Sequence, residues 1–191
     1  MDRGRSSVLF DKMEKPIWVR PVSSETNYQE ISHKYGAKVK LFDLVEIEEV
    51  AKRPYQHQTE NIEIIPGSLR VISHCKLSGR QLNDWVSKDP LIFGDCSKSL
   101  SDDRIQSCSI SLMLLKPGQY FYYAYTKEQA RSKFIYKGNC YDLPVTDLSV
   151  SKMVLSGELD AIPGGDVYFT ISLGHVFNNR YYKLIAGVLT V

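Results

Sequence analysis

The sequence is poor in residues that bind metals or form disulfides at recognisable spacings. Its 4 cysteines (Cys75, Cys96, Cys108 and Cys140) include no C-x-x-C pair, and its 4 histidines are scattered. Structural zinc sites depend on such closely spaced pairs. A chain of this length can also bury a sizeable core without covalent cross-links. We therefore expect no metal site, no disulfide framework and free thiols in a reducing cytosol.

Long apolar runs and a strong net charge are also missing. No apolar stretch approaches the ~20 residues that cross a bilayer, and the start, MDRGRSSVLFDKMEK, lacks the apolar run of a secretory signal peptide. These features predict a cytoplasmic protein that does not associate with membranes. The 24 Lys and Arg against 22 Asp and Glu leave a formal charge of +2, which by itself is too small to indicate a polyanionic partner.

Sequence motifs for nucleotide binding and hydrolysis are missing too. The chain has no G-x-x-x-x-G-K-[ST], no G-x-G-x-x-G and no G-x-S-x-G. His57 and Glu60 could form an acid–base pair, but no nucleophile accompanies them. We expect no catalytic residues and no cofactor. An enzyme would require a cleft that joins His57 and Glu60 to a thiol such as Cys75.

Short β-rich runs separated by Gly, Pro, Asn and Asp are what the sequence has in abundance. In the first half they predict strands over residues 17–22, 38–50, 61–65 and 68–73. A helix is expected to follow, because Ser78 and Gln81 have capping-box spacing. The polar run DCSKSLSDDR then indicates a joint. We accordingly predict an N-terminal OB-like barrel with a C-terminal helix (1–93), a linker (94–106) and a C-terminal OB-like barrel (107–191).

The second half gives the clearer fold pattern. Its order is strand, strand, strand, helix, strand, strand, the connectivity of a five-stranded OB barrel. Another small barrel or an α+β sandwich remains an alternative, because chain order does not fix strand pairing. The predicted fold class is all-β, with two tandem small OB-like barrels and one or two short helices. The expected elements are strands over 109–115 and 120–125, a hairpin over 131–145, a helix over 146–157, and strands over 167–173 and 181–191.

Several stretches together resemble bacterial proteins described as dual OB-containing domain proteins. They are WVRPVS (18–23), LFDLVEI followed by QHQTEN (56–61), YDLPVTDLSV (141–150), and VYFTISLG with YYKLIAGVL (167–174 and 181–189). The resemblance implies two tandem OB-like barrels and a connection with nucleic acids. The start of the chain departs from the family pattern, and this departure implies that the first strand of the first barrel is shortened or altered.

Two clusters of the first half are candidate binding residues. On a strand, Trp18 and Arg20 share a face, so an indole that stacks on bases would lie beside a guanidinium that grips phosphate. Alternatively, Trp18 is a core residue and Arg20 pairs with Asp43 or Glu60. In the polar run 56–61, Gln58 and Asn61 offer paired donors and acceptors for a base or small polar ligand. The alternative is a structural turn.

Tyrosine is unusually frequent in the second half, where basic residues interleave with it. Arg131 and Lys133 share a strand face opposite Phe134 and Tyr136, and Tyr141 lies on the neighbouring strand. Aromatic platforms beside a cationic groove are how OB folds hold single strands. The alternative is a barrel wall with the rings inward.

These patterns leave two main functions open. The first is a non-catalytic module that binds single-stranded DNA or RNA through Trp18, Arg20, Arg131, Lys133 and Tyr141. The second is a ligand-sensing or protein-interaction module that acts with a partner enzyme, for which a neutral pocket lined by Gln58 and Asn61 would be the sign.

Overall fold

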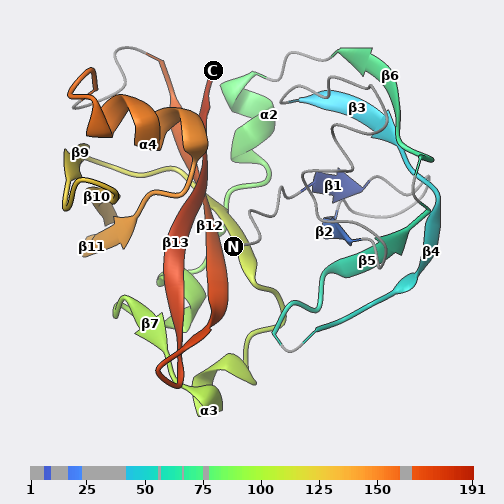
Figure 1. The fold of residues 1–191 in the computed structure, drawn as a ribbon, viewed down its shortest axis with the longest axis horizontal. Coiled ribbons are helices and arrows are strands. Elements are labelled where there is room, and N and C mark those ends of the chain that lie inside the picture. Colours follow the sequence, from blue (N-terminus) through green and yellow to red (C-terminus); the bar gives the residue numbers. More distant parts are fainter. Residues whose placement is uncertain are drawn as a thin grey trace. The chain divides into compact units, whose positions relative to one another are not determined.

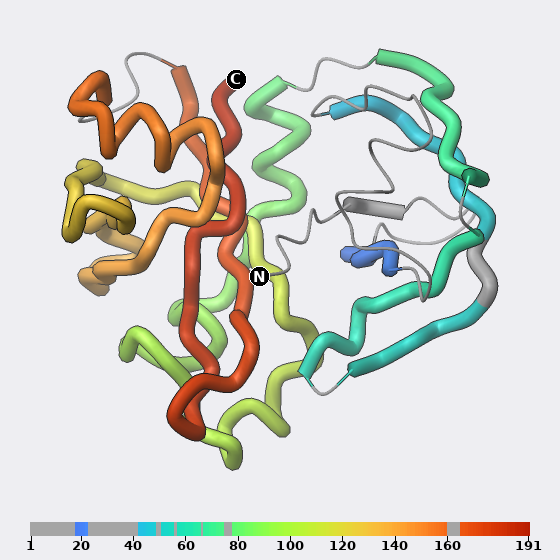
Figure 2. Tube along the Cα trace, in the orientation of Figure 1, coloured from blue at the N-terminus to red at the C-terminus, as the bar shows by residue number. Residues whose placement is uncertain are grey.

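The structure is a computed structural model, and it describes residues 7–9, 17–22, 42–55, 57–65, 67–74, 78–159 and 165–191. The chain forms two compact units, Met1–Leu77 and Ser78–Val191. Strands dominate both units (Figures 1 and 2). The structure therefore confirms the predicted all-β class of tandem OB-like barrels with short helices.

The division between the units lies earlier in the chain than the sequence indicated. Helix α2 (Gly79–Asn83), expected in the first half, is held in the second unit, where the Tyr168 hydroxyl donates to the Gly79 carbonyl at 3.1 Å. The expected linker 94–106 is also part of the second unit. It contributes strand β7 (Ser99–Leu100) and helix α3 (Asp102–Ile105). The segment is mostly polar, but two of its apolar side chains, Leu100 and Ile105, are buried. The polar composition therefore did not indicate that the segment packs in the unit.

The described residues of unit 1 form two small sheets. One has the order β1-β2-β5-β4, with β2 and β5 parallel, and the other pairs β3 with β6. Strand β1 spans 3 residues, Ser7–Leu9. The strands are β1 (Ser7–Leu9), β2 (Ile17–Val22), β3 (Asp43–Glu46), β4 (Glu49–Lys52), β5 (Asn61–Ile64) and β6 (Arg70–His74).

The single strand predicted over 38–50 is wrong within its described part, because β3 and β4 belong to different sheets. The chain turns between them at Ile47 and Glu48. Ile47 packs against the core of unit 1, formed by Val19, Ile62 and Ile64. The Glu48 amide donates to Ser68 Oγ at 3.0 Å. The strand is therefore interrupted where Ile47 packs in the core and the Glu48 amide bonds to a side chain. The alternation of apolar and polar residues alone does not reveal this interruption.

Unit 2 holds the remaining elements. The hairpin turn predicted between its two central strands is present, with positive φ at Lys137 (47°) and Gly138 (82°). Its helices are short, and among the described residues none is long and apolar enough to cross a membrane. The further elements are η1 (Ile92–Gly94), β8 (Leu112–Leu115), β9 (Tyr120–Ala124), β10 (Ala130–Tyr136), β11 (Asn139–Pro144), α4 (Leu148–Leu155), β12 (Val167–Phe177) and β13 (Arg180–Thr190).

The strand pairs of unit 2 close a circuit. Strand β9 pairs with β10, β10 with β11, β13 with β12, and β12 with β8, all antiparallel. A parallel bridge between Val145 and Ile185 joins the end of β11 to β13. Because only Lys116–Gln119 separate β8 from β9, these two segments together act as one bent first strand. The circuit then has the five members of an OB barrel, with α4 between the third and fourth.

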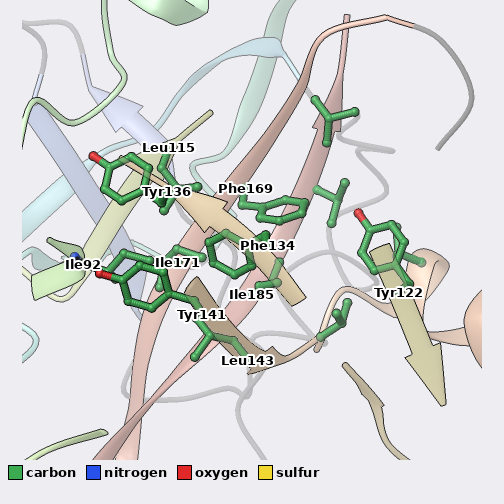
Figure 3. Close-up of a cluster of buried hydrophobic side chains, with 14 of the residues drawn as sticks. Ile92, Leu115, Tyr122, Phe134, Tyr136, Tyr141, Leu143, Phe169, Ile171 and Ile185 are labelled. Atoms are coloured by element: carbon green, nitrogen blue, oxygen red, sulfur yellow. Dashed lines mark hydrogen bonds between the residues drawn. The ribbon is translucent and has the colours of Figure 1, made fainter. Parts of the chain in front are cut away.

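Aromatic rings fill the interior of this barrel (Figure 3). The ring of Phe134 stacks on Tyr141 at a centroid distance of 5.6 Å and meets Phe169 edge-on at 5.2 Å. These rings come from β10, β11 and β12, and each side chain is at most 4% exposed. Ile171, Ile185 and Leu143 complete the same cluster. The core therefore fixes which face of each strand points to solvent.

Helix α4 contacts β9 and β10 and is tied to the barrel by its N-cap (Figure 1). The Asp147 carboxylate accepts from the amides of Ser149 and Val150, both at 3.0 Å. Its second oxygen accepts from the amide of Val188 on β13 at 3.2 Å. One side chain thus starts the helix and holds it to the last strand of the circuit.

Replacement of Asp147 should test this link. We expect Asp147→Ala to lower the free energy of unfolding of unit 2 by about 2 kcal/mol. Asp147→Asn should cost less, because its amide oxygen still accepts. The chain has 2 tryptophans, one in each unit, so Trp85 fluorescence in a Trp18→Phe background reports unit 2 during urea denaturation. Equal stability of Asp147→Ala and the parent would contradict the assigned role.

Candidate functional site

Three aromatic side chains lie on the outer face of β9 and its continuation. Along Tyr120–Ala124 the side chains alternate, so that Tyr122 is buried while Phe121 is 50% exposed. Tyr123 is half-buried on the same outer face, and Tyr125, just past the strand, is 63% exposed. This alternation follows from the pleat of a strand whose other face packs in the core. The result is a row of rings open to solvent.

Two cations stand opposite these rings on β10. The strand register pairs Arg131 with Tyr123 and Lys133 with Phe121. The Lys133 ammonium lies 5.6 Å from the centre of the Tyr123 ring, and the Arg131 guanidinium lies 5.5 Å from that of Tyr125. Both distances are within cation–π range. We call Phe121, Tyr123, Tyr125, Arg131 and Lys133 the aromatic–cation face.

A carboxylate on β11 organises part of this face. Asp142 accepts from Arg131 Nε at 2.8 Å and from the Tyr123 hydroxyl, which lies 2.9 Å from Oδ1 and 2.8 Å from Oδ2. Burial, together with this hydrogen bond, raises the pKa of Tyr123, so its hydroxyl remains a donor near neutral pH. The ring of Tyr123 and the guanidinium of Arg131 are therefore held in fixed positions.

An open hollow of about 530 Å³ adjoins the aromatic–cation face. Its walls come from β10 and β11 and from the segment before β7, which the sequence had indicated as a linker. Lys98 supplies an exposed cation there beside the half-buried Arg131, and Asp142 is the one carboxylate among the lining residues of the described chain. The lining residues are Cys96, Lys98, Tyr125, Arg131, Cys140, Tyr141, Asp142 and Leu143.

Beneath this hollow lies a buried lysine. Lys183 on β13 is fully buried, its ammonium donates to the Asp95 carbonyl, and it lies 5.7 Å from the centre of the Tyr141 ring. Burial lowers the pKa of Lys183 from 10.5 to about 8. The Tyr141 hydroxyl accepts from the Ile92 amide at 3.2 Å. These contacts hold the segment that carries Cys96 and Lys98 against the barrel.

The predicted second-half residues meet at this place in different roles. Arg131 and Lys133 are on the outer face opposite Phe134 and Tyr136, as the alternation predicted. Tyr141 is 4% exposed and belongs to the core cluster, although it also reaches the wall of the hollow. The abundant tyrosines thus divide between the two alternatives considered, since Tyr122, Tyr136 and Tyr168 are buried with Tyr141 while Tyr123 and Tyr125 face outward.

In the first unit, Arg20 forms an ion pair with a carboxylate, which was the alternative to phosphate binding. Its guanidinium pairs with Glu60 at 3.0 Å, and the two side chains are only 10% and 2% exposed. Gripping a phosphate would require this buried pair to separate. Trp18, which shares the strand with Arg20, is half-buried.

Gln58 and Asn61 are buried next to each other. The Asn61 side-chain amide donates to Gln58 Oε1 at 3.3 Å, and the two residues are 8% and 4% exposed. Their burial corresponds to a structural turn rather than to an open loop whose side chains contact a base or a ligand.

Several residues of the site were not singled out from the sequence. Phe121 could have been found, because strict alternation places it with Tyr123. Asp142 could have been found from the hairpin register, which pairs it with Lys133. Lys98 and Lys183 gave no local signal, since their positions depend on contacts between distant segments.

The cysteines of the described chain carry no cross-link. Cys96 and Cys140 are exposed free thiols, and Cys108 is a half-buried one, whereas Cys75 lies outside the described residues. Within the described ranges, no group of three or more His, Cys, Asp or Glu side chains is arranged to hold a metal ion.

Comparison with known proteins identifies one family. The model of the dual OB-containing domain family matches residues 10–188 of this chain. No curated protein and no solved structure matches this chain. The family match covers nearly the whole chain, and it confirms the resemblance found in the sequence.

The buried lysine predicts a pH dependence of stability. Lys183 should lose its proton near pH 8 when folded but near pH 10.5 when unfolded. Between these values the unfolded chain binds more protons, so stability should rise with pH. Relative to Lys183→Met, we expect the wild type to gain up to about 3 kcal/mol over this range. Urea denaturation of both proteins at several pH values measures it, and a constant difference would contradict it.

Proposed function

Because this chain belongs to the dual OB-containing domain family, we propose that it is a non-catalytic module of tandem OB folds that binds single-stranded DNA or RNA. The aromatic–cation face is the observation that carries the proposal. It lies on the bent first strand and on β10, and the hollow beside it lies on β10 and β11. The second and third strands of OB barrels form the surface on which oligonucleotides commonly bind.

The chemistry of this face suits an unpaired strand. Phe121 and Tyr125 offer exposed rings on which bases stack, an interaction worth about 1–3 kcal/mol per base. Lys133 and Lys98 are exposed, and within the described chain neither forms an ion pair, so their ammonium groups are available to phosphates. Arg131, by contrast, is already engaged by Asp142 and serves mainly to hold the Tyr125 ring.

Binding of this kind should be weak and only modestly dependent on salt. The formal charge of the chain is only +2, and Asp142 offsets part of the positive charge on the face. Phosphate contacts release counterions, so affinity falls with ionic strength in proportion to their number. Because only a few lysines contact phosphates, the affinity should depend only shallowly on salt. Stacking should contribute more to the free energy of binding than these contacts do.

The hollow also supports a second candidate function. Its volume of about 530 Å³ is within the range of small-molecule sites, about 300–1,000 Å³. A ligand-sensing or protein-interaction module that acts with a partner enzyme would use the same residues. This function predicts saturable binding of one small ligand without dependence on oligonucleotide length.

Fluorescence anisotropy with labelled single-stranded DNA and RNA at low salt tests the proposal. Phe121→Ala and Tyr125→Ala should each weaken binding about fivefold or more, because each removes a stacking platform. Lys133→Gln should reduce the slope of log affinity against log salt by about 1.

Exposed residues that do not belong to the aromatic–cation face provide matched controls. Lys152→Gln on α4 and Tyr55→Ala in unit 1 remove the same kinds of side chain and should leave affinity unchanged. The proposal fails if the wild type binds neither nucleic acid at concentrations up to about 100 μM, the weak end of non-specific affinity.

A further inference from the structure

The carboxylate of Asp142 is out of place in a surface built only for phosphates. Its side chain is 39% exposed and lines the hollow beside Lys98 and Arg131. A phosphate near this position would meet a like charge, which disfavours it. A donor N–H group would be attracted instead, because an ionised carboxylate only accepts hydrogen bonds.

The carboxylate retains capacity to accept one more hydrogen bond. Oδ1 accepts from Arg131 Nε at 2.8 Å and shares the Tyr123 hydroxyl with Oδ2. Each carboxylate oxygen has about two acceptor positions. Oδ1 is therefore filled, whereas Oδ2 has one position left. A single donor fits this arrangement better than the paired N–H groups on the Watson–Crick edge of guanine, which require both oxygens.

Among nucleobases, the matching donor is an exocyclic amino group beside a ring nitrogen that accepts. Cytosine and adenine present this arrangement on their Watson–Crick edges, and acidic side chains accept from cytosine N4 in known recognition. Thymine and uracil place their N–H between two carbonyl oxygens, which a carboxylate repels. Tyr123 and Arg131 already hold Asp142 in position, so its side chain loses little conformational entropy when a base binds.

We propose that Asp142 gives this face a base preference, accepting from the amino group of cytosine or adenine and disfavouring thymine and uracil. The inference rests on the proposed binding of single strands. Stacking on Phe121 and Tyr125 would hold any base, since every base has a π-face. Asp142 would then select among bases that stack in the hollow.

The test compares labelled oligodeoxycytidine, oligodeoxyadenosine and oligothymidine of equal length, at slightly alkaline pH so that cytosine is unprotonated. We expect the wild type to bind the cytosine and adenine strands about fivefold or more tighter than the thymine strand. The two amino-bearing strands distinguish a pyrimidine from a purine occupant. Asp142→Asn should bring the ratios close to one, because an amide both donates and accepts.

Asp103→Asn is the matched control. It makes the same change in net charge on the exposed helix α3 and should leave the ratios intact. Equal affinity of the wild type for all three strands, or ratios that survive Asp142→Asn, would overturn the inference. If those strands still lose affinity with Phe121→Ala, the proposed function stands without it. No binding of any strand would overturn both. Should Asp142→Asn fail to fold, the wild-type ratios decide.

Discussion

The packing of Phe134 between Tyr141 and Phe169 is the interaction on which the second unit depends. It sets the inner face of β10, and the pleat then directs Arg131 and Lys133 outward. The same constraint acts on β9, where burial of Tyr122 exposes Phe121. A shift of one residue in either register would bury the cations and expose the core rings. The arrangement of the aromatic–cation face is thus a direct consequence of core packing.

A second set of contacts attaches a polar segment to the barrel wall. Leu100 is fully buried, Arg180 donates to Ser99 Oγ at 2.7 Å, and Lys183 donates to the Asp95 carbonyl. Burying an amine is costly unless hydrogen bonds compensate it. Here the cost accompanies a structural gain, because the segment brings Lys98 to the edge of the hollow. The same contacts therefore anchor the segment and place Lys98 beside the hollow.

Much of the fold could be predicted from local patterns. Capping residues identified α2 and α4, Gly138 identified the central hairpin, and alternation in β10 gave the correct outer face. These signals are carried by residues close in sequence, where backbone sterics and hydrogen bonding decide. The division at Leu77 and the break at Ile47 could not be predicted, because each depends on a few apolar side chains that pack against distant strands.

The candidate site shows the same limit. Arg131 and Lys133 were found because their strand is regular. Tyr141 is buried in the core and also lines the hollow, and tyrosine content alone does not tell an interior ring from a stacking platform. Lys98 joins the site only through pairing of its segment with β13, and no periodicity reports such a contact.

The closure of the circuit by β13 has a consequence for how the protein is made. Strand β13 supplies the partners of β12, of β7 and of the Val145 bridge, yet it is the last strand of the barrel in chain order. On the ribosome, β9, β10 and β11 can form a meander early, but β12 and β13 do not yet cover the apolar face of this meander. The nascent chain must carry this exposed surface until β13 has been synthesised, a period in which chaperones or neighbouring chains have access to it.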